Sequence, residues 1–231
     1  MPEKEIIEKL TRNDIPLTSS VIIDDFTRAA SKAFDLEFNG VSKFYPWNKP
    51  ETLKKDFKLG VIYGGSGSGK TKLLKEFGNE EIIEWEDNKA IISHFDTPDD
   101  GINRLSAVGL NSIPAWHKQY SVLSNGEQFR ADLARRIKNN AVIDEFTSVV
   151  DRNVAKAAST ALSKYIKNTN LHGIVLATCH EDILDWLQPD WVINTNTGEI
   201  YDGFFLSARQ SISKYIAAIT IRGACLKNII I

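Results

Sequence analysis

The stretch GGSGSGKT, from Gly64 to Thr71, constrains the fold of this chain more than any other part of the sequence. It matches G-x-x-x-x-G-K-[S/T], in which glycines let backbone N–H groups turn inward around phosphate oxygens. A chance match in a Gly/Ser-rich turn is the alternative, but the motif lies between an apolar stretch, KLGVIYG, and a helical one, KTKLLKEF, as it must. The predicted phosphate-binding residues are Gly64, Gly65, Ser66, Gly67, Ser68, Gly69, Lys70 and Thr71.

Two side chains of this loop have specific chemistry. Lys70 supplies a cation for the β and γ phosphates, and the Thr71 hydroxyl is a ligand suited to Mg²⁺. The helix that begins at the loop adds its partial positive charge. The loop therefore predicts binding of a nucleoside triphosphate with Mg²⁺.

Apolar strand-like stretches alternate with helical ones along the chain. Residues 141–146 and 173–179 are expected as buried strands, and residues 126–139 and 151–169 as helices. This order predicts an α/β fold with a largely parallel sheet. Further elements are expected as a helix over 21–34, two strands around a turn over 35–47, strands over 81–86 and 89–95, a short helix over 181–188 and a hairpin over 191–203, with residues 1–20 as a loosely docked arm.

Two acids, Asp144 and Glu145, stand where the strand AVIDEF ends. An Asp in this place holds Mg²⁺ in enzymes with a phosphate-binding loop, and a neighbouring carboxylate can orient and polarise the attacking water. An ordinary strand-to-loop transition would give the same letters. The loop at Gly64 to Thr71 favours the functional interpretation.

The bulk properties exclude several classes of protein. The chain has 231 residues, 42% of them hydrophobic, which is enough for the core of one large domain. A net charge of −2 shows no overall basic excess of the kind that marks nucleic-acid binding, although a local basic patch is compatible with this balance. The cysteines Cys179 and Cys225 show no metal spacing and are expected as reduced thiols. No signal-type apolar core and no membrane span are expected, which predicts a cytoplasmic protein.

The order of the motifs resembles that of an ABC-type ATPase. After the phosphate loop come LSNGEQ, VIDEF, SVVD and TCHED. The signature loop of that family is Leu-Ser-Gly-Gly-Gln, and Ser124 and Gly126 match the two positions of it that matter most, while Asn125 departs from it. Asp151 matches the family's D-loop and His180 its switch histidine. Tyr45, which lies 25 residues before Lys70, matches the aromatic residue that stacks on adenine; Phe44 and Trp47 compete for that role.

The resemblance implies an ABC-type P-loop NTPase fold, with an N-terminal antiparallel β portion and a reduced helical subdomain over about 97–138. It divides the chain into an arm (1–33), the ATPase domain (34–206) and a tail (207–231). It also implies ATP and Mg²⁺ as ligands and a head-to-tail homodimer, in which Ser124 and Gly126 contact the γ-phosphate bound by the partner. Glu145, positioned with His180, would activate water.

Each transferred role has a simpler alternative. Ser124 followed by Glu127 is also the pattern of a capping box at a helix N-terminus. A lone histidine such as His180 is usually structural or a surface residue. His94 stands in place of the glutamine of the Q-loop, and the segment between His94 and Ser124 is short, which argues against an ordinary transporter subunit.

The stretches VIDEFTSVVDRNVAKAAS and TCHEDILDWLQPDW resemble the ABC-type ATPase found joined to a predicted N-acetyltransferase domain. The expected partner is a client protein, an acetyltransferase-type partner or nucleic acid, with the apolar tail packing against it. The alternatives are a transporter's nucleotide-binding subunit and an ATP-gated binding module with little turnover.

Overall fold

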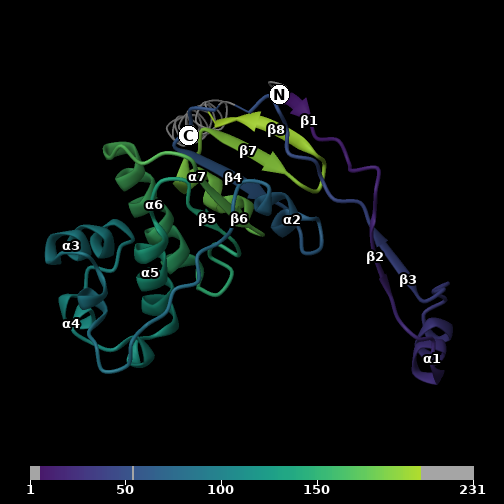
Figure 1. Ribbon diagram of the computed structural model, residues 1–231, viewed down its shortest axis with the longest axis horizontal. Helices are drawn as coiled ribbons and strands as arrows, with labels where there is room; N and C mark the ends of the chain where they lie inside the picture. The colour runs from purple at the N-terminus through teal and green to yellow at the C-terminus, as the bar shows by residue number, and fades with distance from the viewer. Residues whose placement is uncertain (1–5, 54, 204–231) are drawn as a thin grey trace, which may run out of the picture.

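A mixed six-stranded sheet forms the centre of the computed structural model, which describes residues 6–53 and 55–203 (Figure 1). The strand order is β1-β8-β7-β4-β6-β5. The three inner pairings from β7 to β5 are parallel, and β8 and β1 add an antiparallel edge. The strands are β1 (Ile6–Lys9), β4 (Leu59–Tyr63), β5 (Val142–Ile143), β6 (Ile174–Thr178), β7 (Trp191–Asn194) and β8 (Glu199–Asp202).

The central strands are apolar along their whole length because both faces of the sheet are covered. All five residues of β4 and all five of β6 are buried. Along β4 the side chains alternate: Val61 packs into the core under the helical region, and Ile62 packs into a second core with Leu73 of α2 (Lys70–Lys75). This two-sided burial explains why the sequence shows continuous apolar runs here instead of alternation.

Helices α5 (Asn125–Arg136) and α6 (Arg152–Asn168) pack against the face of the sheet opposite α2 (Figure 1). Helix α6 buries one stripe, which includes Ala158, Leu162 and Ile166. The remaining helical elements are α3 (Pro98–Ala107), α4 (Ile113–Trp116), α7 (Leu184–Leu187) and the 3₁₀ helices η1 (Ile91–His94), η2 (Tyr120–Val122) and η3 (Glu181–Ile183).

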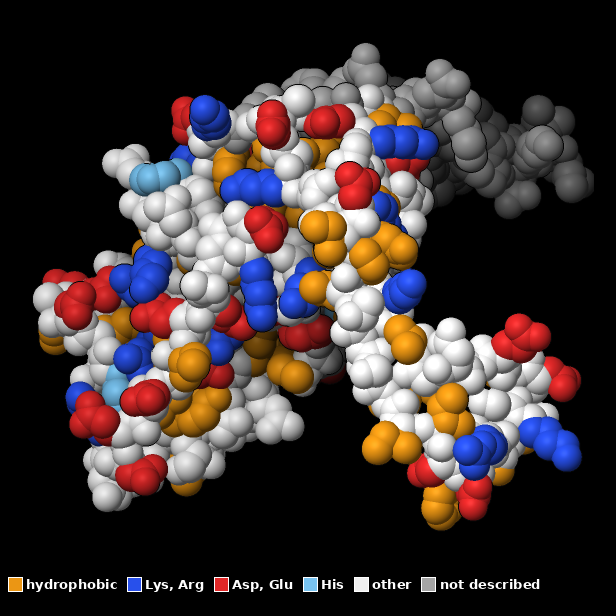
Figure 2. Space-filling view, turned by 45° about the vertical axis from the view of Figure 1, so that its right-hand side comes forward, with side chains coloured by type: hydrophobic (Ala, Val, Ile, Leu, Met, Phe, Trp, Pro, Cys, Tyr) orange, Lys and Arg blue, Asp and Glu red, His pale blue; other side chains and the backbone are white. Residues whose placement is uncertain are grey.

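A small arm projects from the main body. It consists of the hairpin β2 (Leu17–Ser20) and β3 (Val41–Phe44), with α1 (Asp25–Ala33) inserted between the strands. Figure 2 shows the arm as a separate lobe with hydrophobic side chains on its surface. Phe26 and Phe34 are 85% and 84% exposed, so α1 contributes no side chain to the core.

The predicted class, α/β with a mostly parallel central sheet and an antiparallel β portion, is confirmed. The predicted helix over 21–34, the short helix over 181–188 and the hairpin over 191–203 form as α1, as η3 with α7, and as β7–β8. The 1–33/34–206 boundary and the 97–138 subdomain stay predictions, and the tail 207–231 lies outside the described residues. Among the residues that are described, no helix has the length and apolarity needed to cross a membrane.

Four predictions of local structure are wrong. Residues 81–86 form no strand, and residues 89–95 contain η1 instead of a strand. The N–H of Ile91 donates to the carbonyl oxygen of Lys118, which lies in an irregular segment and not in a strand. Only one strand, β3, forms within 35–47. Residues 1–20 are not a loosely docked arm throughout, since β1 pairs with β8 at the sheet edge and β2 with β3. These pairings depend on distant partners, which hydropathy does not reveal.

Candidate active site

The phosphate loop leaves β4 and enters α2, as its sequence predicts. Gly69, at the N-cap of α2, has φ of 100°, and a side chain there would lie 2.7 Å from Cζ of Phe44. Gly67 also has positive φ, at 75°, but faces open space. Only glycine adopts such conformations at little cost. The left-handed turn at Gly69 therefore fixes the direction in which the loop enters the helix.

Lys70 is folded into the loop. Its side chain is buried, with 6% of the residue exposed, and Nζ donates a hydrogen bond to the carbonyl oxygen of Gly65 (2.8 Å). Thr71 is exposed on the first turn of α2. The lysine ammonium is thus held inside the curve of the loop.

The turn between β7 and β8 braces the phosphate loop, a contact that sequence reasoning missed. The Gly65 N–H donates to Oδ1 of Asn196 (2.9 Å), and the hydroxyls of Ser68 and Thr195 lie 2.6 Å apart. The indole N–H of Trp47 reaches the carbonyl oxygens of both Ser68 and Thr195 (3.1 and 3.2 Å). The sequence carries no signal for this contact, because the partners are separated by more than a hundred residues.

Asp144 and Glu145 follow β5 directly. Asp144 is half-buried, Glu145 is exposed, and the Glu145 N–H donates to Oδ1 of Asp144 (2.9 Å). Glu145 has φ of 48°, unusual for a residue with a side chain. The Ser148 hydroxyl donates to the Glu145 carboxylate. Ser148 therefore holds the carboxylate in place, and this residue too was missed.

His180 lies just after β6, the strand between β4 and β5. Its Nδ1 is 3.3 Å from the hydroxyl of Thr147, a buried residue on the loop after β5. Because β4, β5 and β6 run parallel, their carboxyl ends meet at one edge of the sheet. The sheet therefore brings the phosphate loop, the two acids and His180 to the same edge, where ligands of such sheets bind.

Ser124 forms the capping box that its sequence also allowed. Its Oγ accepts from the Glu127 N–H (3.4 Å) and donates to Oε2 of Glu127 (2.8 Å), and the Ser124 N–H donates to the same oxygen (2.9 Å). Gly126 lies on the first turn of α5, where an added side chain would meet Val154 at 3.4 Å. Within one chain Ser124 thus acts as a helix cap; the contact of Ser124 and Gly126 with a partner's nucleotide stays a prediction.

Asp151 also acts as a helix cap. Its Oδ1 accepts from the N–H groups of Asn153 (2.8 Å) and Val154 (3.1 Å) at the start of α6. The predicted nucleotide contact of Asp151 is not tested by this arrangement. The carboxylate is exposed, so the cap leaves part of it accessible.

Of the three aromatic residues considered for stacking on adenine, two lie against the phosphate loop. Phe44 and Trp47 lie closest to the position of a Gly69 side chain. Tyr45, the residue predicted to stack on adenine, is 44% exposed and offers its carbonyl oxygen to Arg12 (2.6 Å). The Arg12 guanidinium covers the Trp47 ring at 3.5 Å. One face of Trp47 is therefore already stacked, and the role of Tyr45 stays a prediction.

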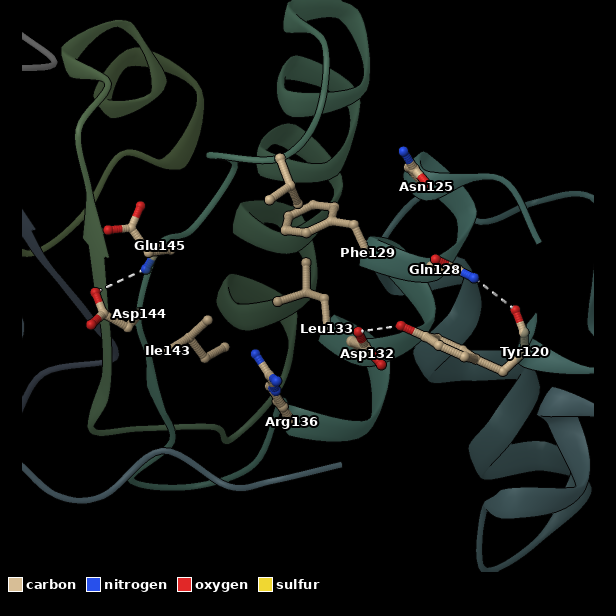
Figure 3. Close-up of a pocket in the computed structure, with 11 residues that line it drawn as sticks. Tyr120, Asn125, Gln128, Phe129, Asp132, Leu133, Arg136, Ile143, Asp144 and Glu145 are labelled. Carbon is tan, nitrogen blue, oxygen red and sulfur yellow. Dashed lines mark hydrogen bonds between the residues drawn. The ribbon is translucent and has the colours of Figure 1, made fainter. Parts of the chain in front are cut away.

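His94, which stands in the place of the Q-loop glutamine, is engaged locally. Its Nε2 accepts from the Glu86 N–H (3.0 Å), which leaves Nδ1 to donate to the Ala90 carbonyl oxygen (3.0 Å). A different glutamine, Gln128, lines a pocket of about 410 Å³ together with Asp144 and Glu145 (Figure 3). The Gln128 amide donates to the carbonyl oxygen of Tyr120 (3.1 Å) and so points away from the two acids (Figure 3).

No protein-family model matches the chain, and no curated protein matches it significantly. Solved structures are similar to it at low identity. The dimeric structure of MJ0796, described as a bacterial ABC transporter cassette, is 16% identical over 66% of this chain and 87% of that chain, with a TM-score of 0.47. A dimeric post-hydrolysis state of the MJ0796 ATP-binding cassette with ADP and Pi is 14% identical over 84% and 94%, with a TM-score of 0.48. The chain is also similar to cbiO1 from Clostridium perfringens, part of the ABC transporter complex cbiONQ, at 16% identity over 78% and 88%, with a TM-score of 0.47.

Proposed function

We propose that this chain is an ABC-type ATPase that binds and hydrolyses Mg-ATP in a head-to-tail dimer. One observation carries the proposal: three neighbouring parallel strands end at one edge, and each delivers a different part of an ATP-hydrolysing site. β4 leads into the phosphate loop, β5 into Asp144 and Glu145, and β6 into His180. The order of these motifs along the chain supports the same assignment.

The roles follow from the chemistry of each group. Backbone N–H groups of the loop and the Lys70 ammonium bind the phosphate chain. When it does so, the Lys70 ammonium gives up its hydrogen bond to the Gly65 carbonyl oxygen and donates to phosphate oxygens instead. Glu145 accepts a proton from the attacking water, whose oxygen bonds to the γ-phosphorus while the bond between the γ-phosphorus and the β–γ bridging oxygen breaks and ADP leaves. His180, held next to Thr147, orients the water or the γ-phosphate.

The residues present fit Mg²⁺. A hydroxyl from Thr71 and a carboxylate from Asp144 are oxygen donors, the type that Mg²⁺ prefers, and phosphate oxygens would complete the set. When bound, the ion neutralises charge that develops on the phosphates. Thr71 is exposed and Asp144 only half-buried, so both groups are accessible to it.

In the proposed dimer, each copy contributes residues to the nucleotide site of the other. Ser124, Gly126 and Asp151 lie at the N-terminal ends of α5 and α6, which favour anions. In a head-to-tail pair these ends would face the γ-phosphate held by Lys70 of the other copy. Hydrolysis removes the shared phosphate contact and lets the pair open.

Phosphate release from Mg-ATP, together with ATP binding, tests the proposal. We expect Glu145→Gln to lower turnover by about a hundredfold or more while ATP still binds, because only the proton acceptor is lost. Lys70→Ala should abolish ATP binding, whereas Lys72→Ala, an exposed lysine on the same helix, should change neither property. Turnover that is equal in wild type and Glu145→Gln would contradict the assigned chemistry.

A further inference from the structure

The backbone N–H of Asp144 is held by a residue from a distant part of the chain, Glu80. Asp144 directly follows β5, which is the last strand on its side of the sheet in the part of the chain that the structure describes. A strand in this position has no neighbour to accept hydrogen bonds along its outer edge. Oε1 of Glu80 accepts from the Asp144 N–H (3.2 Å). A side chain therefore fixes the backbone at the first of the two acids.

The local sequence explains how Glu80 reaches this position. Helix α2 ends at Lys75, and Gly78 follows with φ of 153°, a conformation that favours glycine. A Cβ at Gly78 would lie 3.1 Å from Cγ2 of Val142 in β5, so the absence of a side chain lets the chain pass close to this strand. Glu80 comes two residues later and lies beside the end of the same strand.

Arg136, in the last turn of α5, holds Glu80 in turn. Its Nη1 donates to Oε1 of Glu80 (2.8 Å), the same oxygen that accepts from the Asp144 N–H. Arg136 and Asp144 line the same pocket (Figure 3). The ion pair offsets the charge of Glu80, which would otherwise repel the Asp144 carboxylate. One carboxylate oxygen thus joins the end of α5 to the backbone of the acidic pair.

The Asp144 carboxylate is tied to this same stretch of backbone. Its Oδ1 accepts from the Glu145 N–H (2.9 Å), so a shift of the backbone would move the carboxylate with it. Mg²⁺ demands near-ideal octahedral geometry from its ligands. We propose that Glu80 is a positioning residue, which with Arg136 holds the Asp144 carboxylate in the place where it binds Mg²⁺. This inference rests on the proposed function, in which Asp144 is a ligand of the ion.

Calorimetric titration of ATP into the full chain, once with Mg²⁺ and once with EDTA, tests this role. The background is Glu145→Gln, so that ATP is not consumed. The ratio of the two affinities measures the contribution of Mg²⁺ to binding. We expect Glu80→Ala to lower this ratio about fivefold, through the loss of one hydrogen bond, and to leave the affinity in EDTA unchanged. Glu80→Gln keeps an oxygen acceptor and should stay within about twofold of the background.

Glu81→Ala is the matched control. Glu81 is adjacent to Glu80 and also pairs with a cation, Nζ of Lys138 (2.7 Å). Among the hydrogen bonds and ion pairs of the described residues, it has none with Asp144. Glu81→Ala should therefore leave both affinities unchanged. A general effect of losing a surface ion pair would appear in both alanine variants alike.

The outcomes separate this inference from the proposed function. A background protein that binds ATP while Glu80→Ala leaves the ratio unchanged, or lowers both affinities equally, would overturn the role of Glu80 alone. A loss in Glu80→Ala that Glu80→Gln does not rescue would overturn it as well. A background protein that binds no ATP, with or without Mg²⁺, would refute the proposed function and this inference with it. Circular dichroism of each variant confirms that it is folded before titration.

Discussion

The central residue of the candidate site is Glu145, and its geometry is set by one neighbour. Ser148 donates its hydroxyl to the Glu145 carboxylate from the loop after β5, and its Oγ lies 3.8 Å from Sγ of the exposed Cys179. The backbone of Glu145 also has φ of 48°, in the left-handed region that residues with a side chain rarely adopt. A proton acceptor works only when it is held within hydrogen-bond reach of the water it activates.

Removal of the Ser148 hydroxyl should therefore lower kcat and leave KM for ATP nearly unchanged. One hydrogen bond is worth about 1 kcal/mol, which corresponds to about a fivefold loss in kcat for Ser148→Ala. Steady-state kinetics of phosphate release measure both constants. Ser106→Ala, an exposed serine on α3, is the control. A rise in KM with unchanged kcat would show that Ser148 acts on binding instead.

The elements around the site depend on tight turns that only certain residues make. Gly69 needs both a left-handed backbone and the absence of a side chain, because Phe44 lies over it. Gly67 needs only the left-handed backbone. Substituting each of these two glycines therefore distinguishes the cost of backbone strain, which both share, from the cost of steric overlap, which only Gly69 has.

We expect Gly69→Ala to destabilise the protein by about 1–3 kcal/mol more than Gly67→Ala, the extra cost coming from overlap with Phe44. Urea unfolding of both variants measures the difference in free energy of unfolding. Equal losses would mean that Phe44 moves away at no cost. Such a result would also remove the structural reason for an aromatic residue at this position.

The cap of α5 should make stability depend on pH. The folded pKa of Glu127 lies below its usual value of 4.5, so its contribution is present above that value and is lost as pH falls through the folded pKa. Glu127→Gln should therefore lower the free energy of unfolding slightly near pH 7 and have a smaller effect near pH 3. Unfolding curves at the two pH values test this; an equal effect at both would exclude the ionised cap.

The parts that sequence predicted well are those with local signals. The phosphate loop, the acidic end of β5 and the amphipathic stripe of α6 each follow from spacing within one short stretch. The predicted strands over 81–86 and 89–95 failed because their apolar residues Trp85, Ile91 and Ile92 pack under the helical region without any strand partner. Pairing is a long-range property, so β-like composition alone did not decide it.

At the scale of the whole molecule, the features that sequence missed join distant segments. Asn196 and Thr195 hold the phosphate loop from a hairpin at the other end of the chain, and β1 closes the sheet edge next to β8. For the exposed lobe that carries Phe26 and Phe34, the sequence predicted an amphipathic helix but not that the lobe stands apart from the main body (Figure 2). Such contacts are fixed by topology, which composition and periodicity leave open.

The most direct test of the proposed function is the solution mass of the Glu145→Gln variant in saturating Mg-ATP and again in Mg-ADP. Light scattering should give twice the 25.9 kDa of one chain with ATP, and 25.9 kDa with ADP. The reason is that only the γ-phosphate joins the Lys70 site of one copy to Ser124 and Gly126 of the other. A mass of 25.9 kDa in both nucleotides, at every protein concentration, would contradict the head-to-tail dimer and leave Ser124 as a helix cap alone.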